Sequence, residues 1–174
     1  MHNQEQFLAL LRDALENIRE PRFFETERGF QGELLAHLRN RLEFAELPGE
    51  PIVEQEYQKT ISFHGLKIRP DIIIHIPFER GRVERRDQGN FVAIELKLRS
   101  TESEARDDFA KLQQMWEVLG YPLTIFINID SDQTHAAVRP EVIAGQTACY
   151  ATRLEDGAPV VRVSGPAARN DGPR

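Results

Sequence analysis

The stretch FVAIELKL, residues 91–98, has the apolar pattern of a β-strand and carries two charged side chains, Glu95 and Lys97. Side chains alternate between the faces of a strand, so these two emerge on the same face, next to each other. A charged side chain is seldom placed inside a buried strand unless it has a partner or a role. The simpler interpretation is an ion pair on a solvated face, but Phe91 and Ala93 share that face and favour a functional role.

A second apolar stretch, LKIRPDIIIHIP at 66–77, supplies another carboxylate. It is rich in β-branched residues, which favour strands, and Asp71 opens its apolar part directly after Pro70. If the two strands are neighbours, Asp71 and Glu95 meet at one edge of a sheet, and the polar insert 78–90 is a hairpin loop. Taken alone, Asp71 is equally well explained as a turn residue that starts the strand.

The order of the other elements predicts an α/β protein with a mixed central sheet flanked by helices. Apolar residues at helical spacing predict helices over 4–19 and about 29–45, and a T-x-x-E capping box at Thr101 starts a third helix that ends at Gly120. A short helix is expected within 131–145. Strands are expected in stretches rich in β-branched and aromatic residues: 52–63, 66–77, 91–98, 121–130, and an edge pair from 147–154 and 158–165.

Length and composition indicate one soluble domain over 1–163, followed by a flexible tail at 164–174. The 174 residues are 40% hydrophobic and 29% charged, and no apolar run approaches the length of a membrane span. The N-terminus lacks the pattern of a secretory signal, and a single cysteine, Cys149, suits a reducing compartment, so a cytoplasmic location is expected.

The formal net charge of −6 argues against broad, nonspecific binding of nucleic acid. The basic residues are unevenly distributed, however, and four arginines fall within the polar insert. A local basic surface and a solvated loop explain this cluster equally well. Its members are Arg80, Arg82, Arg85 and Arg86.

Two carboxylates that converge beside a lysine form a chemically useful set. Mg²⁺ prefers oxygen ligands and commonly uses one or two protein carboxylates together with water and substrate phosphates. A metal so bound stabilises charge on a phosphodiester and lowers the pKa of an attacking water. A neighbouring lysine offsets the repulsion between the carboxylates and can contact the phosphate or the water.

The motif RPD at 69–71, followed by ELK at 95–97, resembles the signature of the PD-(D/E)xK nuclease superfamily. That superfamily has the restriction-endonuclease-like fold, with an α-β-β-β-α-β core. The order of elements expected over about 27–129 is similar, so the resemblance covers most of the chain. It implies such a core with an extra N-terminal helix.

The resemblance also implies roles for individual residues. Asp71, Glu95 and the backbone carbonyl of Leu96 would bind the metal, Mg²⁺ or Mn²⁺, and Lys97 would be the catalytic lysine. Many members add a glutamate from the first core helix, and Glu33 is in a suitable position to be a further ligand and catalytic group. The implied activity is hydrolysis of phosphodiester bonds as a nuclease or endonuclease, in DNA rather than RNA.

Three further residues are candidates for lining the cleft: His75, Lys111 and Gln114. His75 shares a face with Asp71, but a core histidine with satisfied hydrogen bonds is the more frequent case. Lys111 is spaced to pair with Asp107 on an exposed helix face.

The competing hypothesis is a nuclease-like binding or assembly module, without catalysis, in a nucleic-acid-processing complex. The acidic net charge favours this hypothesis. Since cleavage of a duplex requires two active sites, a homodimer or a larger complex is compatible with the nuclease hypothesis. No membrane partner is expected.

Overall fold

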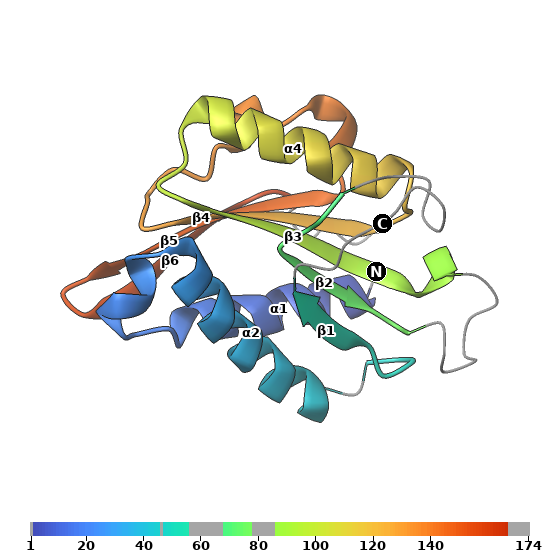
Figure 1. The fold of residues 1–174 in the computed structure, drawn as a ribbon, viewed down its shortest axis with the longest axis horizontal. Coiled ribbons are helices and arrows are strands. Elements are labelled where there is room, and N and C mark those ends of the chain that lie inside the picture. Colours follow the sequence, from blue (N-terminus) through green and yellow to red (C-terminus); the bar gives the residue numbers. More distant parts are fainter. Residues whose placement is uncertain (1, 46, 56–67, 78–85, 167–174) are drawn as a thin grey trace, which may run out of the picture.

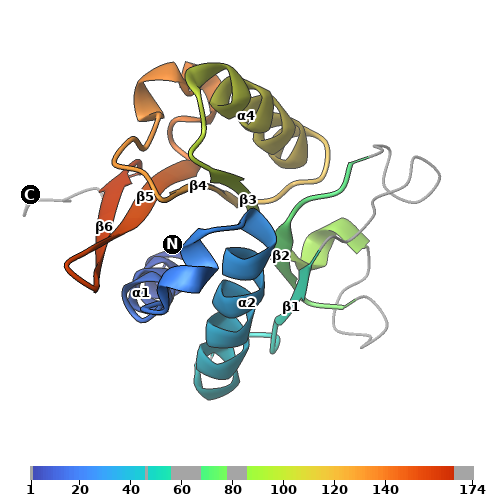
Figure 2. The same cartoon turned by 60° about the vertical axis from the view of Figure 1, so that its left-hand side comes forward.

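The computed structural model describes residues 2–45, 47–55, 68–77 and 86–166, which form an open, six-stranded mixed sheet with helices on both faces (Figures 1 and 2). The α-helices are α1 (His2–Glu16), α2 (Glu27–Phe44) and α4 (Glu102–Glu117). The strands are β1 (Ile52–Gln55), β2 (Ile72–His75), β3 (Asn90–Leu98), β4 (Leu123–Ile129), β5 (Thr147–Glu155) and β6 (Ala158–Ser164). Short 3₁₀ helices cover Pro21–Phe24, Arg86–Gly89, Ala136–Val138 and Glu141–Ile143.

The strands lie side by side in chain order, from β1 to β6. Strands β1, β2 and β3 are antiparallel, β3, β4 and β5 run parallel, and β6 returns antiparallel to β5. A parallel pair needs a crossover connection, which α4 provides between β3 and β4. All seven residues of β4 are buried, as expected for a parallel strand covered on both faces.

Two separate apolar layers hold the helices to the sheet. Helices α1 and α2 cover one face, where the even-numbered β3 residues Val92, Ile94 and Leu96 are buried. Helix α4 covers the opposite face, where Ala93 of β3 packs with Phe109 of α4 (Figure 1). The alternation of side chains along β3 therefore directs Glu95, an odd-numbered residue, towards the α4 layer.

The predicted elements are present, with several differences in their bounds. Helix α2 begins at Glu27 rather than near 29, because the side chain of Thr26 caps it by accepting a hydrogen bond from the Gly29 N–H. The first strand ends at Gln55, and the rest of the predicted stretch, 56–63, lies outside the described residues. The short helix expected within 131–145 is instead two 3₁₀ turns.

The prediction of an edge pair from 147–154 and 158–165 is confirmed, because β5 and β6 pair antiparallel at one end of the strand order. Strand β5 lies inside the sheet between β4 and β6, and its residues 147–152 are buried. Parallel pairing with β4 covers the other side of β5, so β6 is the outermost strand at this edge of the described sheet. The four arginines of the polar insert and the predicted tail are largely outside the described residues, which include Arg86 and end at residue 166.

Within the described residues, we find no helix that is both long and apolar enough to cross a membrane.

The capping box predicted at Thr101 is confirmed, and it fixes where α4 begins. The Thr101 hydroxyl accepts a hydrogen bond from the Glu104 N–H, while the Glu104 carboxylate accepts one from the Thr101 N–H. We expect Thr101→Ala to lower the free energy of unfolding by about 1 kcal/mol, because a helix-end donor loses its acceptor. Urea denaturation checks this against Ser103→Ala, an exposed change in the first turn of the same helix. Equal stability of the two variants would contradict a stabilising role for the cap.

Candidate functional site

The candidate site lies where β3 runs past the start of β2. Pro70, just before β2, has no N–H and ends the regular pairing of the two strands. Beyond this point, side-chain carboxylates accept the hydrogen bonds that backbone N–H groups of β3 donate. The Leu96 N–H donates to Asp71 Oδ2 at 2.7 Å, and the Leu98 N–H donates to Glu27 Oε2 at 3.3 Å. Asp71 and Glu27 are therefore oriented by the backbone of the strand that carries Glu95.

Asp71 and Glu95 form a carboxylate pair at this end of the sheet. Burial raises the pKa of the Asp71 carboxyl to about 6, although the hydrogen bond from the Leu96 N–H acts in the opposite direction. Glu95 is only 2% exposed, and burial, together with the negative charge of Asp71, raises its pKa well above the usual value. Both carboxyls are thus unfavourable as bare anions, which is typical of groups that await a cation.

One oxygen of Glu95 has no hydrogen-bond partner within the described part of the chain. Its Oε2 lies 3.3 Å from Lys111 Nζ, whereas its Oε1 is buried and unpaired. A buried carboxylate oxygen without a donor costs stability, so it marks a place where a ligand can be bound.

Lys111 reaches the site from α4 together with Asp108. Its Nζ lies 2.6 Å from Asp108 Oδ1 as well as 3.3 Å from Glu95 Oε2. Burial alone would lower the pKa of Lys111, but the charges of Glu95 and Asp108 outweigh it and raise the pKa above its ordinary value. The prediction that Lys111 pairs with Asp107 on an exposed face is corrected: its partners are Asp108, three residues away, and Glu95.

These residues line a polar pocket of about 290 Å³. Helices on both faces of the sheet contribute side chains to this pocket: α2 from one face and α4 from the other. The lining residues are Glu27, Arg28, Gln31, Arg69, Asp71, Glu95, Leu96, Lys97, Asp108 and Lys111.

Side chains in the first two turns of α2 form hydrogen bonds with β3 and with the residue directly before β2. The side-chain amide of Gln31, which is 5% exposed, donates to the backbone carbonyl of Asp71 at 2.7 Å. Glu27, besides accepting from the Leu98 N–H, lies 3.9 Å from Lys97 Nζ. Helix α2 thus fixes the start of β2 and the end of β3 relative to each other.

The structure brings together five of the residues that the sequence singled out: Asp71, Glu95, Leu96, Lys97 and Lys111. Three others are not among the residues that line the pocket. Glu33 lies 3.4 Å from His37 Nε2 on α2. His75 contacts Glu54 of β1 at 2.7 Å, and Gln114 is exposed on α4.

Five further residues that line the pocket were given no role by sequence reasoning: Glu27, Arg28, Gln31, Arg69 and Asp108. The signal for Glu27 was Thr26, because threonine is a favoured N-cap residue. A helix capped by Thr26 begins at Glu27 and not at residue 29, which places Glu27 in its first turn. Asp108 stands three residues after Ala105 and directly before Phe109, on the apolar face of α4. An aspartate on such a face is a signal for a buried, functional carboxylate.

The donor set suits a hard divalent cation. Asp71 and Glu95 provide two carboxylates, and the unpaired Glu95 Oε1 is an oxygen donor of the kind that Mg²⁺ and Mn²⁺ prefer. Over the described ranges, no group of three or more His, Cys, Asp or Glu side chains is placed to hold a metal ion.

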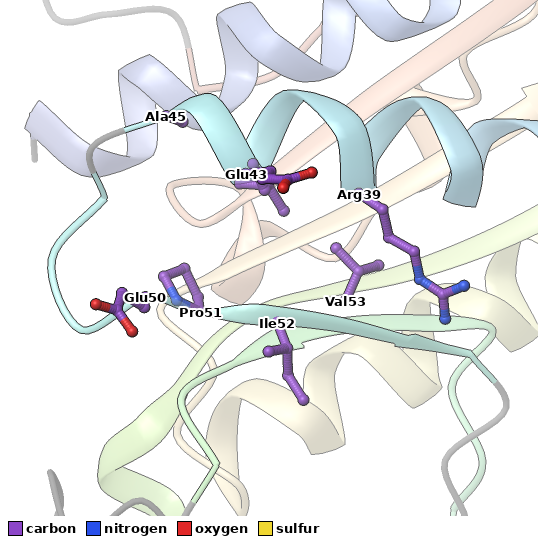
Figure 3. A pocket seen from close by; sticks show the side chains of 8 residues that line it. Arg39, Glu43, Ala45, Glu50, Pro51, Ile52 and Val53 are labelled. Carbon is purple, nitrogen blue, oxygen red and sulfur yellow. The ribbon is translucent and has the colours of Figure 1, made fainter.

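A second groove, of about 450 Å³, lies between the C-terminal part of α2 and β1 (Figure 3). Its charged side chains, Arg39, Glu43 and Glu50, are all exposed. Exposed charges keep their ordinary hydration and need no ligand, so this groove lacks the buried carboxylates that distinguish the first pocket.

Comparisons of the chain with protein-family models, with curated proteins and with solved structures find no match.

Proposed function

We propose that this protein is a divalent-metal-dependent nuclease that hydrolyses phosphodiester bonds, in DNA rather than RNA. The observation that carries the proposal is the carboxylate pair of half-buried Asp71 and buried Glu95, which faces a pocket rimmed by cationic side chains. Buried carboxylates attract a divalent cation, and lysine and arginine at the rim attract phosphate. A phosphodiester is a substrate that such a site suits, since the metal and the cationic side chains both offset its negative charge.

Asp71 and Glu95 would hold the metal, with the backbone carbonyl of Leu96 as a further candidate ligand by resemblance. When bound, the metal supplies charge stabilisation at the phosphodiester and lowers the pKa of a coordinated water. The contribution of the chain itself is orientation. The Leu96 N–H fixes one oxygen of Asp71, and Gln31 fixes the backbone of the same residue. Preorganised ligands of this kind need little rearrangement on binding.

The arrangement of elements supports a restriction-endonuclease-like core. Helix α2 is followed by β1, β2 and β3, and then by α4 and β4, which is the order α-β-β-β-α-β. Asp71 lies at the start of the second of these strands and Glu95 within the third. Glu27, in the first turn of α2, lines the pocket, whereas Glu33 is not among its lining residues. Helix α1 is the extra N-terminal helix.

The proposal is tested by incubating the purified chain with plasmid DNA, single-stranded DNA and RNA in Mg²⁺, Mn²⁺ or EDTA. We expect cleavage of DNA in either metal and none in EDTA. Nicked plasmid would indicate a single site that acts on one strand, and linear plasmid two sites acting together. If none of the three nucleic acids is cut in Mg²⁺ or Mn²⁺, the nuclease proposal is wrong.

One observation favours the alternative of an assembly module without catalysis. Lys111 already lies against Glu95 and offsets its charge, as a bound cation would. Thermal unfolding with and without 10 mM Mg²⁺ or Mn²⁺ separates the two functions. A bound metal stabilises the folded state, whereas an idle cluster leaves the melting temperature unchanged.

A further inference from the structure

We propose that Lys111, carried by α4 and positioned by Asp108, is the lysine that acts on the substrate phosphate in this site. Lys97, the lysine of the ELK motif, would instead mainly join β3 to α2. This inference rests on the proposed function, because it assigns the lysine of the same site.

The position of Lys111 is the first argument. Its side chain is 45% exposed, whereas those of its two partners, Glu95 and Asp108, are 3% and 5% exposed. The ammonium therefore lies at the boundary between buried carboxylates and the open pocket. A phosphate that approaches the carboxylate pair through this pocket meets the ammonium beside Glu95.

The position of Lys97 is the second argument. Its ion pair is with Glu27 at 3.9 Å, the long end of the range for such contacts. Glu27 also accepts a hydrogen bond from the Leu98 N–H. Lys97 is thus directed to the contact between the end of β3 and the first turn of α2, whereas Lys111 is the lysine paired with Glu95.

Asp108 is the third argument, because a carboxylate buried on an apolar helix face is costly unless it serves a partner. It lies one turn before Lys111 and holds the ammonium at 2.6 Å, which is shorter than the contact with Glu95. Its Oδ2 has no hydrogen-bond partner within the described ranges. Asp108 therefore gives Lys111 a partner that does not depend on Glu95, and the ammonium stays in the pocket when Glu95 binds a cation.

The experiment compares Lys111→Met with Lys97→Met in two measurements on the full chain: the rate of DNA cleavage in Mg²⁺, and Mn²⁺ binding by calorimetry. For Lys111→Met we expect cleavage to fall by about 100-fold or more, the usual effect of removing a preorganised electrostatic group. Its Mn²⁺ affinity should be equal to or tighter than that of the wild type, because no ammonium competes for Glu95. For Lys97→Met we expect a smaller loss, of about tenfold, the low end for a residue that acts through others. Lys111→Arg should restore part of the rate.

Lys111→Met leaves Glu95 and Asp108 buried without a cation, so the double variant Asp108→Asn/Lys111→Met is made as well. It removes one of the two charges, and melting curves verify that it is folded at the assay temperature. A folded double variant that cleaves within tenfold of the wild type overturns the assignment.

A larger loss in Lys97→Met than in Lys111→Met also overturns the assignment, but leaves the nuclease proposal intact because wild-type cleavage remains. A wild type that neither cuts DNA nor binds Mn²⁺ overturns both proposals.

Discussion

Glu95→Gln is expected to reduce metal-dependent DNA cleavage by about 10³-fold or more, which corresponds to the several kcal/mol of charge stabilisation that a bound metal contributes. Glutamine keeps the shape of the side chain but removes the negative charge that attracts the cation. The substitution also removes a buried carboxylate whose pKa is raised by burial and by Asp71. The variant should therefore remain folded, and the loss should be one of function.

The matched control for Glu95→Gln is Glu43→Gln, which makes the same chemical change at an exposed residue of α2 in the second groove (Figure 3). Cleavage rates and Mg²⁺-dependent melting temperatures are measured for both variants. We expect Glu43→Gln to behave as the wild type in both measurements. If Glu95→Gln cuts DNA at the wild-type rate, Glu95 has no role in the proposed active site.

Asp71→Asn is expected to make the metal-free protein more stable at pH 8, by about 2–3 kcal/mol. Burial raises the pKa of Asp71 from 3.8 to about 6 in the folded protein, so folding favours the protonated form. The wild type therefore loses stability as the pH rises from about 4 to about 6, and stays at the lower value above that range. Asparagine is neutral at every pH and can still accept the hydrogen bond from the Leu96 N–H.

Urea denaturation in EDTA at pH 8 and pH 4 measures this difference. The free energy of unfolding of Asp71→Asn should exceed that of the wild type by a large amount at pH 8 and by a small amount at pH 4. Asp156→Asn serves as the control, because Asp156 is exposed in the turn between β5 and β6 with a φ of 50°, which asparagine tolerates. Added Mg²⁺ should stabilise the wild type, by about 2.7 kcal/mol at one hundred times its Kd, but not Asp71→Asn. A pH-independent difference between variant and wild type would show that Asp71 is not held in a costly, charged form.

The strand FVAIELKL and its charged residues could be predicted because their signal is local. Period-2 alternation places Glu95 on one face, and the β-branched run after Asp71 identifies the neighbouring strand. The structure bears out this pairing, with β2 antiparallel to β3. Both carboxylates reach the same pocket because the strands are adjacent in the sheet as well as in the chain.

The helix contributions to the site could not be predicted as well, because they depend on how helices pack. The apolar stripe of α2 fits equally well with a helix that starts at Glu27 or at 29, and only the Thr26 cap distinguishes the two starts. The pairing of Lys111 was mistaken for a similar reason. Sequence spacing offers Asp107 and Asp108 about equally, and the choice between them is made by the packing of α4 on β3, which buries Asp108.

The carboxylates of the site also complete the hydrogen bonding of the sheet. The backbone amides that they bind can therefore be used to follow the state of the site. Asp71 and Glu27 accept from the amides of Leu96 and Leu98, at positions where a neighbouring strand would otherwise pair. Opening of the site must break these two bonds, while the remaining ladder between β3 and β4 stays closed. Amide hydrogen exchange at Leu96 and Leu98 would thus measure local opening of the pocket separately from global unfolding.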